Sequence, residues 1–251
     1  MPKNSDDNAF VRKEMAGYYD EIARADRNIG AVINILRQQS VLDNTLIVFL
    51  SDNGSAFGNA KTTLYDEGIK TPLVMRFPPR ISANVVNEQL VSAVDLMPTI
   101  LSLVGVPRIA NAPGVSLWPT LQNPQRAVRD YIYAESNKHG HPLFARAIRT
   151  KQYLYKRNYY GRRLCDPYWD TVWDVRKPRN SEHAQFYNLI NDPQQQVNEI
   201  DNAKYAAPLA EARAKMSAIM AETHQSPPPL ILEACNHRAW FDRIVFSFPE
   251  E

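Results

Sequence analysis

The stretch Thr45-Leu-Ile-Val-Phe-Leu-Ser-Asp-Asn-Gly54 decides how the rest of the sequence is interpreted. Its first part, Thr45–Leu50, is uncharged and rich in bulky side chains, which predicts a strand buried on both faces. Asp52 and Asn53 follow where that strand would end, a place where open α/β sheets bind ligands. Their oxygens suit hard cations such as Ca²⁺ or Mg²⁺. The stretch therefore predicts a strand-end metal site, with a purely structural Asx-Gly turn as the alternative.

Helical and extended segments alternate around this stretch. Apolar residues at spacings of three and four predict a helix over Val11–Gln39, packed against one face of the sheet. Thr71–Phe77 is typical of a second strand, and Ala93–Gly105 of a helix that ends at its glycine. This order favours an α/β fold with a doubly wound sheet, which we expect to occupy residues 1–125.

After residue 125 the sequence changes to short, aromatic-rich extended runs. A hairpin is predicted over Ala147–Lys156, a short strand over Phe186–Leu189 and an alanine-rich helix over Ala206–Thr223. These segments predict a second, α+β unit covering residues 126–251, in which a small antiparallel sheet packs against one helix.

The composition is typical of a globular chain, and the small net charge does not predict an affinity for polyanions. Of its 251 residues 44% are apolar and 22% are charged, and the net charge is +2. We therefore expect no nucleic-acid partner, and the apolar runs are too short for a membrane span. The polar start Met1–Asp7 does not predict a signal peptide there. Cys165 and Cys235 predict either a single disulfide or two free thiols.

The order of the motifs resembles the sulfatase family of the alkaline-phosphatase-like superfamily. The strand-end Asp-Asn pair is followed by a polar loop with Lys61 and then by Glu67-Gly-Ile-Lys-Thr-Pro72. The second part contains Arg146-Ala-Ile-Arg-Thr150 and Phe186-Tyr-Asn-Leu189, which are similar to the family's C-terminal subdomain. The closing stretch Glu222-Thr-His224 is most similar to the heparan N-sulfatase, or sulfamidase, branch.

The resemblance implies a hydrolase of sulfate esters or sulfamates on sulfated carbohydrates, located in a periplasm, a lysosome or outside the cell. It implies that Asp52 and Asn53 bind Ca²⁺ and that Lys61 contacts the sulfate as a catalytic residue. His139 and Arg146 are its candidate substrate-binding residues. The alternatives are a solvated lysine, a surface histidine without a role, and an arginine that pairs with a carboxylate.

The family's nucleophile is a formylglycine made from the Cys or Ser of a Cys/Ser-x-Pro-x-Arg motif, which does not occur in this sequence. Asp6 and Asp7 are expected to be a solvated terminus and not the family's first metal ligands. Our hypothesis is a C-terminal sulfatase half that is inactive alone and is complemented by an N-terminal half with the formylglycine. The alternatives are a phosphodiesterase or phosphonate hydrolase of the same superfamily, and a non-catalytic, partner-binding remnant.

Overall fold

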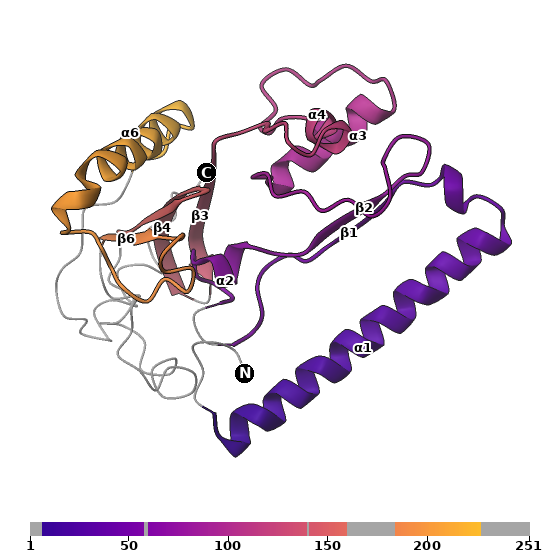
Figure 1. The fold of residues 1–251 in the computed structure, drawn as a ribbon, viewed down its shortest axis with the longest axis horizontal. Helices are drawn as coiled ribbons and strands as arrows, with labels where there is room; N and C mark the ends of the chain where they lie inside the picture. Colours follow the sequence, from indigo (N-terminus) through magenta and orange to yellow (C-terminus); the bar gives the residue numbers. More distant parts are fainter. Residues whose placement is uncertain (1–6, 58–59, 140, 160–183, 227–251) are drawn as a thin grey trace, which may run out of the picture. The chain divides into compact units, whose positions relative to one another are not determined.

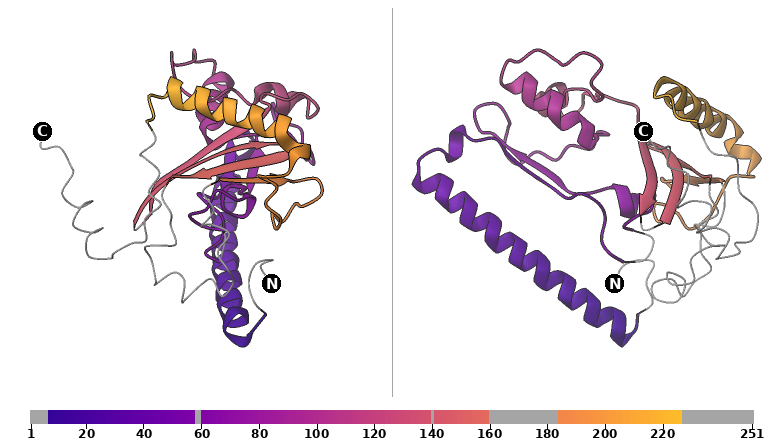
Figure 2. Two further views of the ribbon diagram at one scale, coloured as in Figure 1. Left: turned by 90° about the vertical axis from the view of Figure 1, so that its left-hand side faces the viewer. Right: turned by 180° about the vertical axis from the view of Figure 1, so that it is seen from behind.

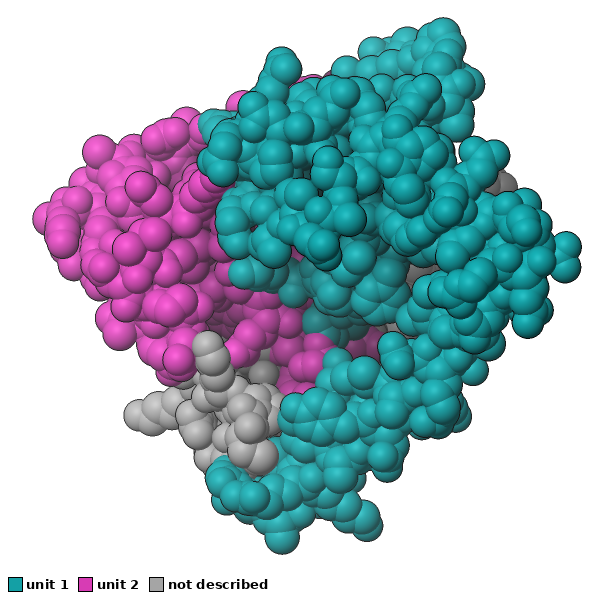
Figure 3. Space-filling view, turned by 45° about the vertical axis from the view of Figure 1, so that its right-hand side comes forward, with its two compact units in different colours: residues 1–54, 70–132 teal, residues 55–69, 133–251 magenta. Residues whose placement is uncertain are grey.

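The chain folds into two compact units in the computed structural model (Figures 1 and 3). The first unit comprises residues 1–54 and 70–132, and the second comprises residues 55–69 and 133–251. The structure describes residues 7–57, 60–139, 141–159 and 184–226. The segment Ser55–Ile69, which carries Lys61, therefore belongs to the second unit although in the sequence it separates the two parts of the first unit.

The first unit begins with helix α1, Ala9–Gln38, close to the predicted helix. Asn8 caps its start, because the Asn8 side chain accepts a 2.9 Å hydrogen bond from the backbone N–H of Val11. No residue of α1 is buried, so the expected packing of its apolar stripe against a sheet is not found among the described residues. No helix in the described part of the chain is both long enough and apolar enough to cross a bilayer.

Strand β1, Ile47–Leu50, pairs antiparallel with β2, Leu73–Arg76, so that Leu50 lies opposite Leu73. Together they form a two-stranded sheet. Phe49 and Leu50 are 41% and 43% exposed. The expectation that β1 is buried on both faces is therefore wrong for the described residues, because β2 pairs along the edge of β1 and covers neither of its faces. The predicted strands themselves are confirmed.

A 3₁₀ helix, η1 (Leu42–Asn44), precedes β1. After β2 the first unit contains the 3₁₀ helix η2 (Ala93–Asp95), helix α3 (Leu96–Leu103) and helix α4 (Trp118–Gln122). Asp95 organises them, because its fully buried carboxylate accepts hydrogen bonds from the backbone N–H groups of Ser92 and Val115 at 2.8 and 2.9 Å. The same carboxylate pairs with the guanidinium of Arg129. A buried carboxylate is stable only when its oxygens are satisfied in this way.

The second unit contains a four-stranded sheet in the order β3-β4-β5-β6. The strands are β3 (Tyr131–His139), β4 (His141–Thr150), β5 (Tyr153–Asn158) and β6 (Ala184–Asn188). Both β4 and β6 run antiparallel to β5, which confirms the predicted hairpin and short strand. Helix α6, Ala206–Glu222, confirms the predicted alanine-rich helix and lies across one face of the sheet (Figure 2).

The register of the sheet assigns its side chains to two differently covered faces. On the face of Phe186, the ring of Tyr153 stacks on it at 5.2 Å and Tyr205, just before α6, contacts both rings. On the opposite face, Leu64 and Tyr65 form a buried apolar cluster with strand residues. The strand and neighbouring residues of that cluster are Ala145, Ala147, Leu154, Tyr187 and Leu189. The sheet is thus enclosed by α6 on one side and by the segment Ser55–Ile69 on the other.

We expect Gly114→Ala to destabilise the first unit by about 1–3 kcal/mol, as overpacking usually does. Gly114 has φ +91°, and a Cβ there would lie 2.2 Å from the carbonyl oxygen of Val94. Gly30→Ala in α1 is the matched control, because a Cβ at Gly30 meets nothing within 4 Å and favours the helix. Urea unfolding of both variants measures the difference, and equal stabilities would contradict the packing described for Gly114.

Candidate active site

The Asp52-Asn53 turn directly follows β1. The Asp52 Oδ1 atom accepts a 2.9 Å hydrogen bond from the backbone N–H of Asn53, and the hydroxyl of Ser51 donates to the Asn53 carbonyl, also at 2.9 Å. The side-chain nitrogen of Asn53 donates to the carbonyl of Gly54 at 2.8 Å, which leaves its Oδ1 atom as the group suited to a cation. Asp52 is exposed to solvent. The turn therefore presents an oriented carboxylate and an oriented amide beside each other.

These oxygens match the donor chemistry of Ca²⁺ but supply only part of its coordination, which takes about six to eight oxygens. The described residues include no cluster of three or more His, Cys, Asp or Glu side chains that could hold a metal ion. The oxygens of Asp52 and Asn53 are chemically compatible with two of the ligands of a calcium ion.

Lys61 lies on a tightly folded part of the segment Ser55–Ile69. Its side chain is exposed, whereas Ala60 and Leu64 on either side are buried. The backbone N–H of Lys61 donates to the carbonyl of Ser55 at 2.9 Å. The next residue, Thr62, has φ 74°, a left-handed conformation that the surrounding packing must maintain. This arrangement holds the backbone of Lys61 in place and leaves its ammonium group accessible to an anion.

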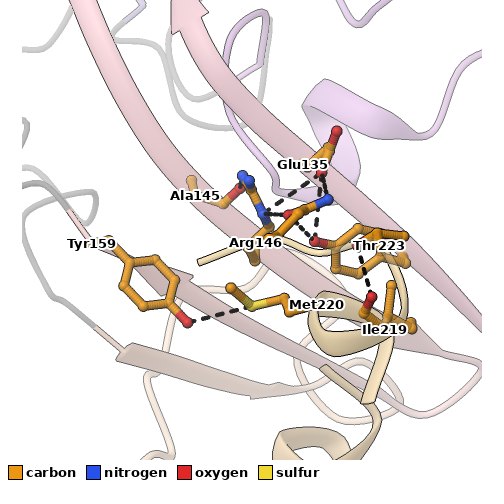
Figure 4. Close-up of polar contacts among 9 residues, drawn as sticks. Glu135, Ala145, Arg146, Tyr159, Ile219, Met220 and Thr223 are labelled. Carbon is orange, nitrogen blue, oxygen red and sulfur yellow. Dashed lines mark hydrogen bonds and ion pairs between the residues drawn. The ribbon is translucent and has the colours of Figure 1, made fainter. Parts of the chain in front are cut away.

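The structure encloses Arg146 within the second unit, where only 1% of its side chain is exposed. Its Nε atom lies 3.6 Å from the carboxylate of Glu135 (Figure 4). The same Nε atom donates to Oε1 of Gln225 at 2.7 Å, and the guanidinium lies 3.8 Å from the centre of the Phe144 ring. Arg146 therefore links β3, β4 and the end of α6. His139 ends β3, and its side chain lies outside the described part of the structure.

Tyr133 belongs to the same cluster, because its hydroxyl donates to Oε1 of Gln225 at 3.0 Å. Burial, which disfavours the phenolate, raises the pKa of Tyr133 to about 12 from 10.0. The positive charge of Arg146 opposes this shift and the carboxylate of Glu135 adds to it, each more weakly than burial. Tyr133 is accordingly a neutral hydrogen-bond donor at physiological pH.

Asp66 and Arg149 form an ion pair that the sequence interpretation did not identify. The Arg149 Nη2 and Nε atoms lie 2.9 and 3.3 Å from the two carboxylate oxygens of Asp66. Asp66 follows the Lys61 loop and Arg149 lies on β4, so nothing local in the sequence relates them. The available signal was the second arginine of the motif Arg146-Ala-Ile-Arg-Thr150, which faces away from the first because adjacent strand residues alternate between faces.

Two protein families match successive, overlapping regions of this chain. Residues 2–106 match the family described as "Sulfatase", and residues 57–222 match "N-sulphoglucosamine sulphohydrolase, C-terminal". The chain is 33% identical over 151 residues to an ulvan-active sulfatase of Formosa agariphila, covering 60% of this chain and 25% of that protein. It is 38% identical over 98 residues to the human N-sulphoglucosamine sulphohydrolase, covering 39% of this chain and 20% of that protein.

Solved structures show the same fold. One, in complex with its substrate D-glucosamine-2-N,6-O-disulfate, has a TM-score of 0.68 at 24% identity over 82% of this chain and 40% of that chain. The phosphonate monoester hydrolase of Agrobacterium radiobacter has a TM-score of 0.63 at 22% identity over 82% of this chain and 40% of that chain. The chain therefore belongs to the sulfatase family, with the alkaline-phosphatase-like fold, and it spans less than half the length of these relatives.

We expect the stability of the second unit to fall as the pH rises from 10.0 towards about 12, because the folded state then retains the Tyr133 proton that the unfolded state releases. Below the unfolded pKa this contribution is fully present. Tyr133→Phe removes it, so the variant should lose less stability between about pH 9 and pH 11. Urea unfolding at both pH values measures the slope, with Tyr19→Phe on the exposed face of α1 as the control. Equal slopes for wild type and Tyr133→Phe would refute the assignment.

Proposed function

We propose that this chain is part of a sulfatase that hydrolyses sulfate esters or sulfamates of sulfated carbohydrates. The observation that carries the proposal is the direct succession of the Asp52-Asn53 turn and the anchored Lys61 loop in a chain of the sulfatase family. The names of the related ulvan-active and N-sulphoglucosamine enzymes, and the disulfated glucosamine in the similar structure, support a sulfated sugar as substrate. By the same resemblance, we propose a periplasmic, secreted or lysosomal location.

The roles of the residues follow from their chemistry. Asp52 supplies a charged oxygen and Asn53 a neutral one to a calcium ion, which would offset the negative charge of the sulfate. Lys61 donates a hydrogen bond to a sulfate oxygen and stabilises the charge that grows there in the transition state. His139 is the proposed contact with the sugar from the second unit. Because Arg146 is enclosed, we propose that it serves substrate binding by holding β3 to β4.

The proposed reaction also needs a nucleophile and a cover for the first unit. The sequence contains no Cys/Ser-x-Pro-x-Arg motif for a formylglycine. Helix α1 buries none of its residues, and Phe49 and Leu50 of β1 are partly exposed. We propose that a complementary sulfatase segment covers these apolar faces and brings the formylglycine. Exposed apolar surface of this kind is typical of an interaction face.

A second candidate activity is phosphonate ester hydrolysis, since one structural neighbour performs it by name. That similarity is one of fold, which hosts different chemistries. Zinc-dependent members of such folds depend on histidine ligands, yet the sequence has no histidine before His139. An Asp-Asn pair without nearby histidine favours calcium and a sulfatase. Comparing an aryl sulfate with a phosphonate monoester as substrates of the assembled enzyme separates the two activities.

In the enzyme assembled from this chain and its complementary segment, Lys61→Ala should lower kcat/KM about a hundredfold or more, because a preorganised contact with the transition-state charge is lost. Calcium binding, followed by isothermal titration calorimetry, should persist. Asp52→Ala should instead abolish calcium binding together with activity. Lys70→Ala, an exposed lysine beyond the loop, is the control. Wild-type kinetics in Lys61→Ala would exclude Lys61 from the site.

The 251-residue chain by itself should show no sulfatase activity, because its sequence provides no formylglycine. The test is turnover of an aryl sulfate by the purified chain, with and without a complementary segment that carries Cys-x-Pro-x-Arg in formylglycine form. Activity that appears only with the segment supports the proposal. Turnover by the chain alone, above that of its own Lys61→Ala variant, would contradict it.

A further inference from the structure

The sheet of the second unit controls the loop that carries Lys61. Between Ala60 and Tyr65 the side chain of Lys61 is exposed, whereas Leu64 and Tyr65 are almost entirely buried. The buried side chains pack on the face of the sheet that α6 does not cover. Residues from the C-terminal part of the sequence therefore hold the loop in place, and Lys61 is the charged group that the loop exposes to solvent.

The first polar anchor is the ion pair between Arg149 and Asp66. The two-pronged contact fixes the orientation of the carboxylate as well as its distance, since the guanidinium is planar and rigid. Both side chains are only 18% exposed, so water screens the pair much less than it would a surface ion pair. The backbone N–H of Asp66 also donates to Oε1 of Gln195 at 3.2 Å. Asp66 is thus held by its side chain and by its backbone.

The second anchor is Tyr65. Its hydroxyl donates to Oε1 of Gln185 at 2.9 Å, and the Nζ atom of Lys156 lies 3.5 Å from the centre of its ring. Lys156 and Gln185 are opposite each other on β5 and β6 and are almost fully buried. A cation over an aromatic face in such a desolvated place is held strongly. Tyr65 therefore contacts two buried polar side chains of the sheet, Lys156 and Gln185, in addition to its apolar neighbours.

Between these anchors and Lys61 the chain has little freedom. The N–H and the hydroxyl of Thr63 both donate to the carbonyl of Ala60, at 3.0 and 2.8 Å. A Cβ at Gly68 would lie 2.4 Å from the carbonyl oxygens of Ala60 and Thr63, so the helical turn α2, Asp66–Ile69, packs directly on the loop backbone. A displacement of Asp66 is consequently transmitted to the backbone at Lys61.

We infer that Arg149 is a positioning residue, which acts through Asp66 to hold the Lys61 loop in its active form. The inference rests on the proposed function only for the role of Lys61 as the sulfate contact. The anchoring itself concerns the loop alone and is measurable without any activity. Its consequence is that the second unit, which lies mostly after residue 132, sets the position of a charged group proposed to act on the substrate.

Hydrogen exchange of the 251-residue chain tests the anchoring. In Arg149→Gln the amide of Lys61, which donates to Ser55, should exchange about ten- to a hundredfold faster, as expected when a charge-assisted contact that closes a local structure is lost. Arg149→Lys keeps the charge but not the fork, and should lie between. Arg157→Gln on the neighbouring strand, an exposed arginine, should leave the loop unchanged.

The pattern of exchange decides between local and general effects. Faster exchange confined to the loop, with β5 and β6 amides as protected as in wild type, supports the inference. Unchanged exchange at Lys61 in Arg149→Gln overturns it, and so does a uniform increase throughout the second unit, which would mark Arg149 as a general stabiliser.

Kinetics of the assembled enzyme test the connection to Lys61. If Arg149 acts through the loop, Arg149→Gln should lower kcat/KM, and the double variant with Lys61→Ala should be no slower than Lys61→Ala alone. Fully additive losses would overturn the inference. If Lys61→Ala is itself as active as wild type, the proposed function fails, while loop-confined exchange in Arg149→Gln would still establish the anchoring.

Discussion

The contact between Tyr65 and the sheet of the second unit is the constraint on which the candidate site depends. Its ring lies over the ammonium group of the buried Lys156, and its hydroxyl satisfies the buried side chain of Gln185. Removing such partners would leave polar groups without water and without a substitute, which is costly. Detaching the segment before Tyr65 from the sheet is therefore costly in free energy. The buried Tyr65 thereby restricts the backbone conformation at the exposed Lys61.

The two units differ in how far their apolar side chains are covered. The sheet of the second unit is covered by α6 on one face and by the segment Ser55–Ile69 on the other. In the first unit the carboxylate of Asp95 organises η2 and α3, but α1 and the β1–β2 ladder retain exposed apolar side chains. A doubly wound sheet is normally covered on both faces, and this difference gives the proposed complementary segment its physical basis.

Local features of this chain were predictable from its sequence, whereas contacts between distant parts of the chain were not. The helices α1 and α6, the hairpin of β4 and β5 and the strand β6 were predictable, because period and turn residues are local properties. Burial of β1 was predicted wrongly, since an apolar run shows what a strand could bury and not what lies beside it. The sequence suggested substrate binding by Arg146, with pairing to a carboxylate as the alternative, and only the fold showed that Glu135, Gln225 and Phe144 surround this residue.

The sequence by itself determined the family, the fold class and the candidate groups Asp52, Asn53 and Lys61, because these depend on residue types at short spacings. Only the tertiary structure decided that the Lys61 loop belongs with the C-terminal sheet and that Arg149 pairs with Asp66. The physical reason is that the sequence of a strand reveals which side chains share a face, but not which segments of the chain pack against that face. Which carboxylate meets a given arginine depends on register and on which segment covers each face, and both arise only when distant parts of the chain pack together.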